Sequence, residues 1–336
     1  MSRPIGSCPH TLDVTTSHSL TDPTAWGDGS LAMASAQLTA VGVGIHTVLI
    51  ATDFSHHSDF ALKYGLDFAH LYGAQAEIVY VLPAEDYVLA GPGGLLAAKD
   101  AARHDVLALK AKLRHSQAFE HDEDYHVSML QGPVADCLLQ LAGEKRIDLI
   151  VVGTHGRSGL GKIILGSVAE KVFRQSPVPV LTIGPHIRRP REISSTHHIL
   201  APCDLAATSH SALQFACSLA KSHNSELTVL HVAERTNSGM KLDPEHGKQE
   251  IREKLAEIVG KSADGVYIHY RIEFGRISST VLDVATETDA DFIVLGVRRS
   301  SGILDRFMWP IAYELVREAA CPVLTIRGCA QPANSQ

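Results

Sequence analysis

Cysteines, a strong net charge and long apolar runs are all scarce or missing in this sequence of 336 residues. The 6 cysteines lie far apart and form no Cys-x-x-Cys pair, so neither a disulfide framework nor a zinc site is indicated. No apolar segment reaches the roughly 18 residues that cross a bilayer. A net charge of −7 gives no electrostatic reason to expect nucleic acid or an anionic membrane as a partner. We therefore expect a cytoplasmic protein that binds neither.

The composition is globular, with 45% apolar and 20% charged residues, and the length suits two domains of about 150 residues each. Residues 1–45 differ from the rest because they are rich in Ser, Thr, Gly and Ala. A secretory signal would carry basic residues and a stronger apolar run there. We interpret this segment as a disordered tail, with export as the alternative.

The chain contains the same unit twice. Residues 46–83 align without a gap with residues 197–234, and the segments ending in LIVVG153 and FIVLG296 also match. The repeat length of about 140 residues is far above that of solenoid repeats, so each copy should be a complete fold. We therefore predict a first copy at 46–185, a linker at 186–196 that is polar and broken by prolines, a second copy at 197–328 and a tail at 329–336.

Short β-branched runs alternate with longer helical patterns in each copy. TVLIAT, EIVYVL, HVSML, LIVVG and PVLTI predict five strands in the first copy, with helices between them. Runs such as LIVVG are apolar throughout, as parallel strands covered on both faces must be. The pattern predicts an α/β fold with two tandem doubly wound five-stranded parallel sheets, in which ligands bind at the carboxyl ends of the strands.

A glycine-rich loop follows the fourth strand of the first copy, from Gly153 to Ser167. Glycines let backbone amides approach an anion, and the helix that follows adds its dipole, so the loop is suited to phosphate. Residues 156–162 also spell G-x-x-x-x-G-K, the start of a Walker A motif. The next residue is Ile163 where that motif needs Ser or Thr, and the loop follows the fourth strand, so we reject a P-loop NTPase.

The spacing Gly-x2-Gly-x9-Gly-Ser after strand four, with TDFS after strand one, resembles the universal stress protein family over residues 46–328. The resemblance implies a nucleotide hydrolase-like α/β fold and, in ATP-binding members, a loop that wraps the ribose and phosphates. It assigns the adenosine contacts to the ends of strands one and two, and the ribose and phosphate contacts to the loop. The implied ATP-binding residues are Thr52, Asp53, Val81, Gly153, Gly156, Gly166, Ser167 and Val168.

The role of Asp53 in the first copy remains open, and the second copy departs from the loop pattern. Asp53 could accept hydrogen bonds from the ligand, cap the helix that begins near Ser55, or do both. In the second copy Arg299, Trp309 and Pro310 replace Gly156, Gly166 and Ser167. Because bulk enters and a proline N–H is missing, we predict that the second copy does not bind ATP in the family's manner.

Catalytic and metal sites are not supported by the sequence. The 19 histidines show no convincing ligand spacing, Cys137 falls in an amphipathic helix as a core residue, and no Ser-His-Asp or Cys-His arrangement can be assembled. We predict no catalytic residue, no metal site and at most weak ATP hydrolysis. The segment from Ala84 to Leu96 has Pro and Gly residues and could cover the nucleotide pocket.

Three functions therefore compete. The first is a stress-response signalling module that binds an adenine nucleotide, ATP with or without Mg²⁺, in the first copy. The second is a slow Mg²⁺-dependent ATPase or phosphotransferase, which would need a residue to position water. The third is a ligand-free dimerising scaffold. We expect the two copies to pair within the chain, and the sequence leaves open a homodimer, the role of the second copy and the choice among ATP, AMP and cyclic AMP.

Overall fold

The computed structural model describes residues 44–83, 91–115, 124–154, 166–187, 191–206, 209–233, 244–297 and 308–327. Residues 1–43 of the predicted N-terminal tail and the whole predicted C-terminal tail lie outside the described residues. The same is true of residues 84–90, which are most of the segment 84–96, and of residues 155–165 in the glycine loop. Ile45 is already buried in the core, with 2% of its surface exposed.

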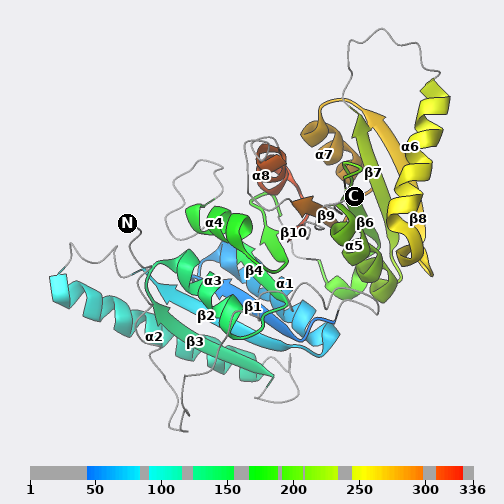
Figure 1. Ribbon diagram of the computed structural model, residues 1–336. Coiled ribbons are helices and arrows are strands. Elements are labelled where there is room, and N and C mark those ends of the chain that lie inside the picture. Colours follow the sequence, from blue (N-terminus) through cyan, green and yellow to red (C-terminus); the bar gives the residue numbers. More distant parts are fainter. Residues whose placement is uncertain are drawn as a thin grey trace, which may run out of the picture.

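In the described part of each copy, five strands are connected by four α-helices (Figure 1). The first copy consists of β1 (Thr47–Thr52), α1 (His56–Tyr72), β2 (Gln75–Leu82), α2 (Gly91–His115), β3 (Tyr125–Gln131), α3 (Val134–Glu144), β4 (Leu149–Gly153), α4 (Ser167–Gln175) and β5 (Val180–Ile183).

The linker contributes a short 3-10 helix, η2 (Ile193–Ser195). The second copy consists of β6 (His198–Pro202), α5 (Ser209–His223), β7 (Glu226–Ala233), α6 (Pro244–Val259), the 3-10 helix η3 (Gly260–Ala263), β8 (Tyr267–Phe274), α7 (Ile277–Glu287), β9 (Phe292–Val297), α8 (Met308–Glu318) and β10 (Val323–Arg327).

The strands form one sheet in the order β3-β2-β1-β4-β5-β10-β9-β6-β7-β8. Within each copy neighbouring strands run parallel, while β5 and β10 pair antiparallel. The chain passes from β1 outward to β2 and β3, and then returns to the other side of β1 for β4 and β5. This reversal is the doubly wound arrangement, so the predicted fold class is confirmed.

The β5–β10 pairing relates the two copies by an approximate two-fold axis. Leu181 lies opposite Leu324, and Val180 and Thr182 lie opposite Thr325 and Val323. In the alignment of the two copies, Leu181 and Leu324 are the same position. Because Leu181 faces its own counterpart, and the pairs on either side of it, Val180–Thr325 and Thr182–Val323, are exchanged by a two-fold rotation, the axis passes between the two leucines, which is the geometry of a self-complementary interface.

Helices cover both faces of the sheet, and each face has a core that continues through both copies. One core takes buried residues from α1, α2, α5 and α6, and the other takes them from α3, α4, α7 and α8. Cys137 lies in α3 and is buried in the second of these cores, as the sequence predicts. Among the described residues, no helix combines the length and the apolar content needed to cross a membrane.

Helix α1 has clear end signals. The hydroxyl of Ser55, its N-cap residue, accepts the N–H of Ser58 at 3.3 Å. At the other end, Gly73 adopts the left-handed conformation with φ 59°, which a residue without Cβ takes at little cost. The helix therefore begins directly after the carboxyl end of β1 and ends where the sequence places the glycine.

Candidate functional site

The strand order reverses between β1 and β4, and this position brings together most of the residues predicted to bind ATP. Thr52 and Asp53 are at the end of β1, Val81 is near the end of β2, and Gly153 ends β4. The carboxyl ends of parallel strands face one edge of the sheet, so these residues share that edge. Of the eight residues predicted to bind ATP, Gly156 lies outside the described residues.

The side chain of Asp53 makes a tight turn at the end of β1. Its Oδ1 accepts the backbone N–H of Ser55 at 3.0 Å and the hydroxyl of Ser55 at 2.6 Å. Ser55, and not Asp53, is the residue that caps α1. Asp53 thus supports the helix indirectly, because it holds the capping residue Ser55 in place. Its role in ligand binding stays a prediction.

The residues around Asp53 form a second small network. Thr52 is buried, and its hydroxyl accepts the N–H of Phe54 at 3.1 Å and lies 3.2 Å from the hydroxyl of Ser58. Phe54 has φ 60°, an uncommon conformation for a bulky residue, and its ring packs against Tyr80 with centroids 5.0 Å apart. At the ends of β1 and β2, the polar turn around Thr52 therefore lies beside the packed rings of Phe54 and Tyr80. Val81 is buried, so what it can offer a ligand at this edge is its backbone.

The two ends of the glycine loop are fastened to each other. Gly166 donates its N–H to the carbonyl oxygen of Thr154 at 2.9 Å, and the Thr154 hydroxyl donates to the carbonyl of Ile183 at 3.1 Å. A Cβ on residue 166 would lie 2.9 Å from the same carbonyl oxygen. Because that neighbour is backbone and cannot turn away, the close approach requires glycine.

Helix α4 begins at this closed loop with its amides available. Gly166 is its N-cap residue and has no side chain to accept the first N–H groups. Ser167 is exposed at the first helical position, and Val168 is partly buried against the core. The first turn of a helix without a side-chain cap offers free N–H groups and the positive end of the dipole to an anion. The arrangement can hold a phosphate group.

The second copy repeats the aspartate turn with a different hydroxyl donor. Asp204 Oδ1 accepts the N–H of Ala206 at 3.0 Å and the hydroxyl of Ser209 at 2.5 Å, and Leu205 has φ 61°. The N–H bond and the positive φ repeat those of Asp53 and Phe54 at the matching positions, while Ser209 is the counterpart of Ser58 and not of Ser55. The aspartate turn is therefore a property of the fold in both copies, and the two sequences differ after β4 and β9. Arg299 and the side chain of Trp309 lie outside the described residues, and Pro310 is exposed in α8.

Sequence reasoning missed Thr154 and Ser58. Neither belongs to the motif quoted for the loop. Thr154 contacts Ile183 on the neighbouring strand, and Ser58 contacts Thr52 across the turn from β1 into α1. Among the described residues there is no group of three His, Cys, Asp or Glu side chains that could hold a metal ion. The histidine pair 197–198 has a structural part instead: His198 lies 3.0 Å from the Thr288 carbonyl and 2.8 Å from the Thr228 hydroxyl.

Fold and sequence together define a tandem α/β protein with a glycine-rich segment between β4 and α4 in its first half. The model of the universal stress protein family matches residues 44–184 and again residues 195–327. The chain belongs to the universal stress protein family.

Several known universal stress proteins are similar to this chain in sequence or in fold. A universal stress protein of Methanocaldococcus jannaschii is 32% identical over 137 residues, which are 40% of this chain and 80% of that protein. A universal stress protein of Mycolicibacterium smegmatis is 23% identical over 292 residues, 83% of this chain and 96% of its own length. The crystal structure of a universal stress protein from Archaeoglobus fulgidus has a TM-score of 0.65 at 20% identity, covering 85% of this chain and 98% of that one.

Proposed function

We propose that this protein is an ATP-binding regulatory protein of the stress response, in which the first copy alone holds the nucleotide. The observation that carries the proposal is the closure of the loop at Thr154 and Gly166, directly before the uncapped start of α4. We assign the phosphates to Gly153, Gly166, Ser167 and the first turn of α4, with Gly156 and Val168 beside them. Thr52, Asp53 and Val81 would contact the adenosine portion.

The same geometry favours binding over rapid hydrolysis. Asp53 is the one carboxylate among the proposed site residues, and its Oδ1 already accepts two hydrogen bonds from Ser55. A phosphoryl-transfer site needs a residue that positions the attacking water and, as a rule, a magnesium ligand. We therefore propose that ATP acts mainly as a signal, and that turnover, with or without Mg²⁺, is slow.

The second copy would act as the structural partner of the first. Its antiparallel pairing through β5 and β10 supports an intramolecular role, since this edge of the sheet is occupied within the chain. The four described cysteines, Cys137, Cys203, Cys217 and Cys321, are buried and form no disulfide bond among themselves, which supports a reducing compartment such as the cytoplasm.

Binding and turnover can be tested on the purified full chain by titration calorimetry with ATP, AMP and cyclic AMP, and by phosphate release with and without Mg²⁺. We expect one ATP per chain and little phosphate release. Gly166→Ala should weaken binding by at least about tenfold, because its Cβ meets the Thr154 carbonyl at 2.9 Å.

The matched control is Gly143→Ala, in α3, where an added Cβ meets no atom within 4 Å. This variant should bind ATP as the wild type does. A wild-type protein without affinity for any adenine nucleotide would contradict the proposal and favour the ligand-free scaffold. Rapid Mg²⁺-dependent phosphate release would favour the ATPase or phosphotransferase instead.

A further inference from the structure

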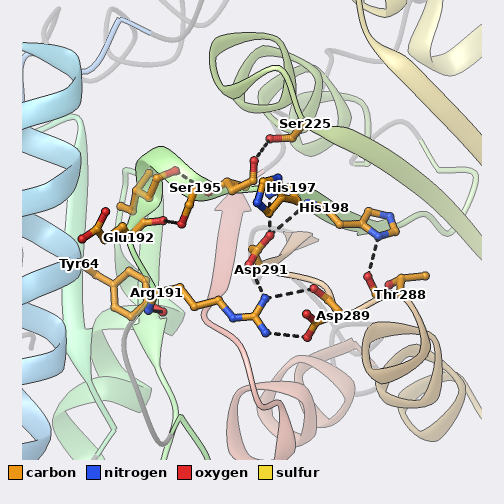
Figure 2. Close-up of polar contacts among 12 residues, drawn as sticks. Tyr64, Arg191, Glu192, Ser195, His197, His198, Ser225, Thr288, Asp289 and Asp291 are labelled. Atoms are coloured by element: carbon orange, nitrogen blue, oxygen red, sulfur yellow. Dashed lines mark hydrogen bonds and ion pairs between the residues drawn. The ribbon is translucent and has the colours of Figure 1, made fainter.

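One residue of the linker, Arg191, makes hydrogen bonds to both copies (Figure 2). Its backbone N–H donates to the Tyr64 hydroxyl of α1 at 3.1 Å. Its guanidinium reaches into the second copy, where Nη1 donates to Asp291 Oδ1 and Nη2 donates to Asp289 Oδ1, each at 2.6 Å. Two short charge-assisted bonds from one guanidinium fix its direction as well as its position.

The carboxylates that hold Arg191 belong to the frame of the second copy. Asp291 is buried, and its second oxygen accepts the N–H groups of His197 at 2.8 Å and His198 at 3.1 Å, where β6 begins. Figure 2 shows these bonds converging on Asp291. The hydrogen bond from Arg191 holds the pKa of Asp289 below its usual value, so this carboxylate is charged at neutral pH. Movement of the guanidinium would therefore disturb the start of β6 and the turn before β9.

On the other side, Tyr64 belongs to a face of α1 that packs against the second copy. The rings of Tyr64 and Phe68 meet Phe292 of β9 edge-on, with centroids 6.2 and 6.0 Å apart. One turn further, Tyr72 meets His223 of α5 at 6.3 Å. Residues four apart share one face of a helix, so the half of α1 from Tyr64 to Tyr72 lies with this face against the second copy.

The other end of α1 is the candidate nucleotide site. The helix begins directly after the turn made by Asp53, and Tyr64 lies eight residues, or about 12 Å, from its first residue. Helix α1 also sits tightly on β1, since a Cβ on Gly65 would lie 2.5 Å from Ile50 Cγ1. The helix must therefore shift as a unit with the strand end, and its displacement reaches Arg191 through the Tyr64 hydroxyl.

We propose that Arg191 is a latch through which helix α1 transmits the nucleotide state of the first copy to the second copy. The inference rests on the proposed nucleotide site. Binding at the Asp53 turn repositions α1, the Tyr64 bond moves the linker, and the guanidinium moves Asp289 and Asp291. A cavity of about 190 Å³ adjoins Tyr64 and Arg191, which leaves room for this side chain to change its direction without displacing the core.

Hydrogen exchange measured by mass spectrometry, with and without ATP and Mg²⁺, tests the latch in the full chain. In the wild type ATP should slow exchange around the Asp53 turn and, in the second copy, in residues 287–292 and 197–202. We expect the distant effect to be at least about fivefold, the lower end of coupling between allosteric sites. In Arg191→Ala the effect around Asp53 should remain and the distant effect should be lost.

Two further variants make the result specific. Tyr64→Phe removes the hydroxyl that accepts the Arg191 N–H and keeps the ring, so it should also lose the distant effect even if Arg191→Ala folds poorly. Arg271→Ala is the matched control, because Arg271 also binds two carboxylates, Glu273 and Glu287, but both lie within the second copy. It should keep the distant effect.

The outcomes separate the two proposals. Protection by ATP that stays within the first copy of the wild type would overturn the latch and leave the nucleotide site standing. Distant protection that survives in both Arg191→Ala and Tyr64→Phe would also overturn it. The absence of any protection, even around Asp53, together with no heat of binding, would overturn the nucleotide site and with it the latch.

Discussion

The turn before β4 and the turn before β9 have the same backbone shape, but their side chains differ. Arg146 and Asp289 occupy matching positions, and both have a positive φ, 51° and 48°. Two residues later, Asp148 and Asp291 each accept two backbone N–H groups from the start of the neighbouring strand. In the second copy the added acid, Asp289, joins Asp291 in binding the linker arginine.

The comparison separates what the fold needs from what each copy does. Both copies have a carboxylate that accepts two backbone N–H groups, Asp148 in the first and Asp291 in the second. Both also have the aspartate turn after their first strand. The loop after β4 and the residue at 146 or 289 have changed. Backbone-supporting positions are thus shared, while side chains that bind a ligand or the linker differ between the copies.

The largest effect is expected when the loop of the second copy is imitated in the first. Gly166→Trp places a large side chain where a Cβ alone would lie 2.9 Å from the Thr154 carbonyl. We expect ATP affinity to fall by at least about a hundredfold, equivalent to about 2.7 kcal/mol. Titration calorimetry measures this, and ATP binding at wild-type strength would show that the loop is not the nucleotide site.

The reverse exchange sharpens the same comparison. A variant with Arg299→Gly, Trp309→Gly and Pro310→Ser restores the loop pattern of the first copy in the second. If these residues alone prevent binding, the stoichiometry should rise from one ATP per chain toward two. An unchanged stoichiometry in a folded variant would place the cause outside these three positions.

In the free energy of unfolding, the largest effect should come from removing the carboxylates before β4 and β9. Asp291→Ala leaves two backbone N–H groups without their acceptor and removes one of the two carboxylates that bind Arg191, at a site where the side chain is 4% exposed, and we expect a loss of about 3 kcal/mol. Asp148→Ala, with 29% exposure, should cost about 1 kcal/mol. Urea unfolding gives both values. Asp100→Ala, on the surface of α2, is the control, and equal losses at 148 and 291 would contradict the comparison.

A smaller effect is expected from exchanging the residues at the two positive-φ positions. Asp289→Arg would put a cation against Arg191, and because Asp289 is exposed we expect a loss of only about 0.5–1 kcal/mol. Arg146→Asp should be within about 0.5 kcal/mol of the wild type, since Asp tolerates this conformation at least as well as Arg. Thermal unfolding of both variants tests this, and a larger loss at 146 than at 289 would refute it.

The smallest effect concerns pH at the contact between α1 and α5. Burial lowers the pKa of His223 from its ordinary value of 6.5. The unfolded chain therefore takes up a proton more readily than the native one, and this histidine makes stability fall as the pH drops below about 6.5 and through the lowered pKa. His223→Gln should show a weaker loss between pH 8 and pH 5 in thermal unfolding.

His246→Gln, an exposed position on α6, serves as the control for this pH series and should follow the wild-type curve. Parallel curves for the wild type and His223→Gln would mean that His223 does not contribute to the acid sensitivity.

The sequence predicts much of the fold because the signals are local. The ten strands follow from apolar β-branched runs, and the end of α1 follows from Gly73, which adopts the left-handed conformation expected there. The alternative in which Asp53 caps α1 was wrong, because Ser55 is the cap and Asp53 holds it, while ligand binding by Asp53 stays a prediction. A composition rule cannot decide between two neighbouring residues that can both accept an N–H.

The rest depends on residues that meet only after folding. The linker is polar and broken by prolines, which in the sequence indicates a simple connection, yet Ile193 is buried and Arg191 binds acids about a hundred positions away. In the same way, Thr154 closes the loop through a carbonyl on β5. Such contacts leave no periodicity or spacing in the sequence, so they could not be predicted.

The axis between Leu181 and Leu324 has a consequence for how this protein can change. When two identical chains meet at a two-fold axis, every substitution appears on both sides at once, and a useful change on one side has to be tolerated on the other. Here both sides are encoded separately, so Tyr72 can face His223 and an arginine can bind on one side alone. Because the two copies are joined in one chain, each half of the interface can mutate independently. One half can then specialise while the other keeps the original contact.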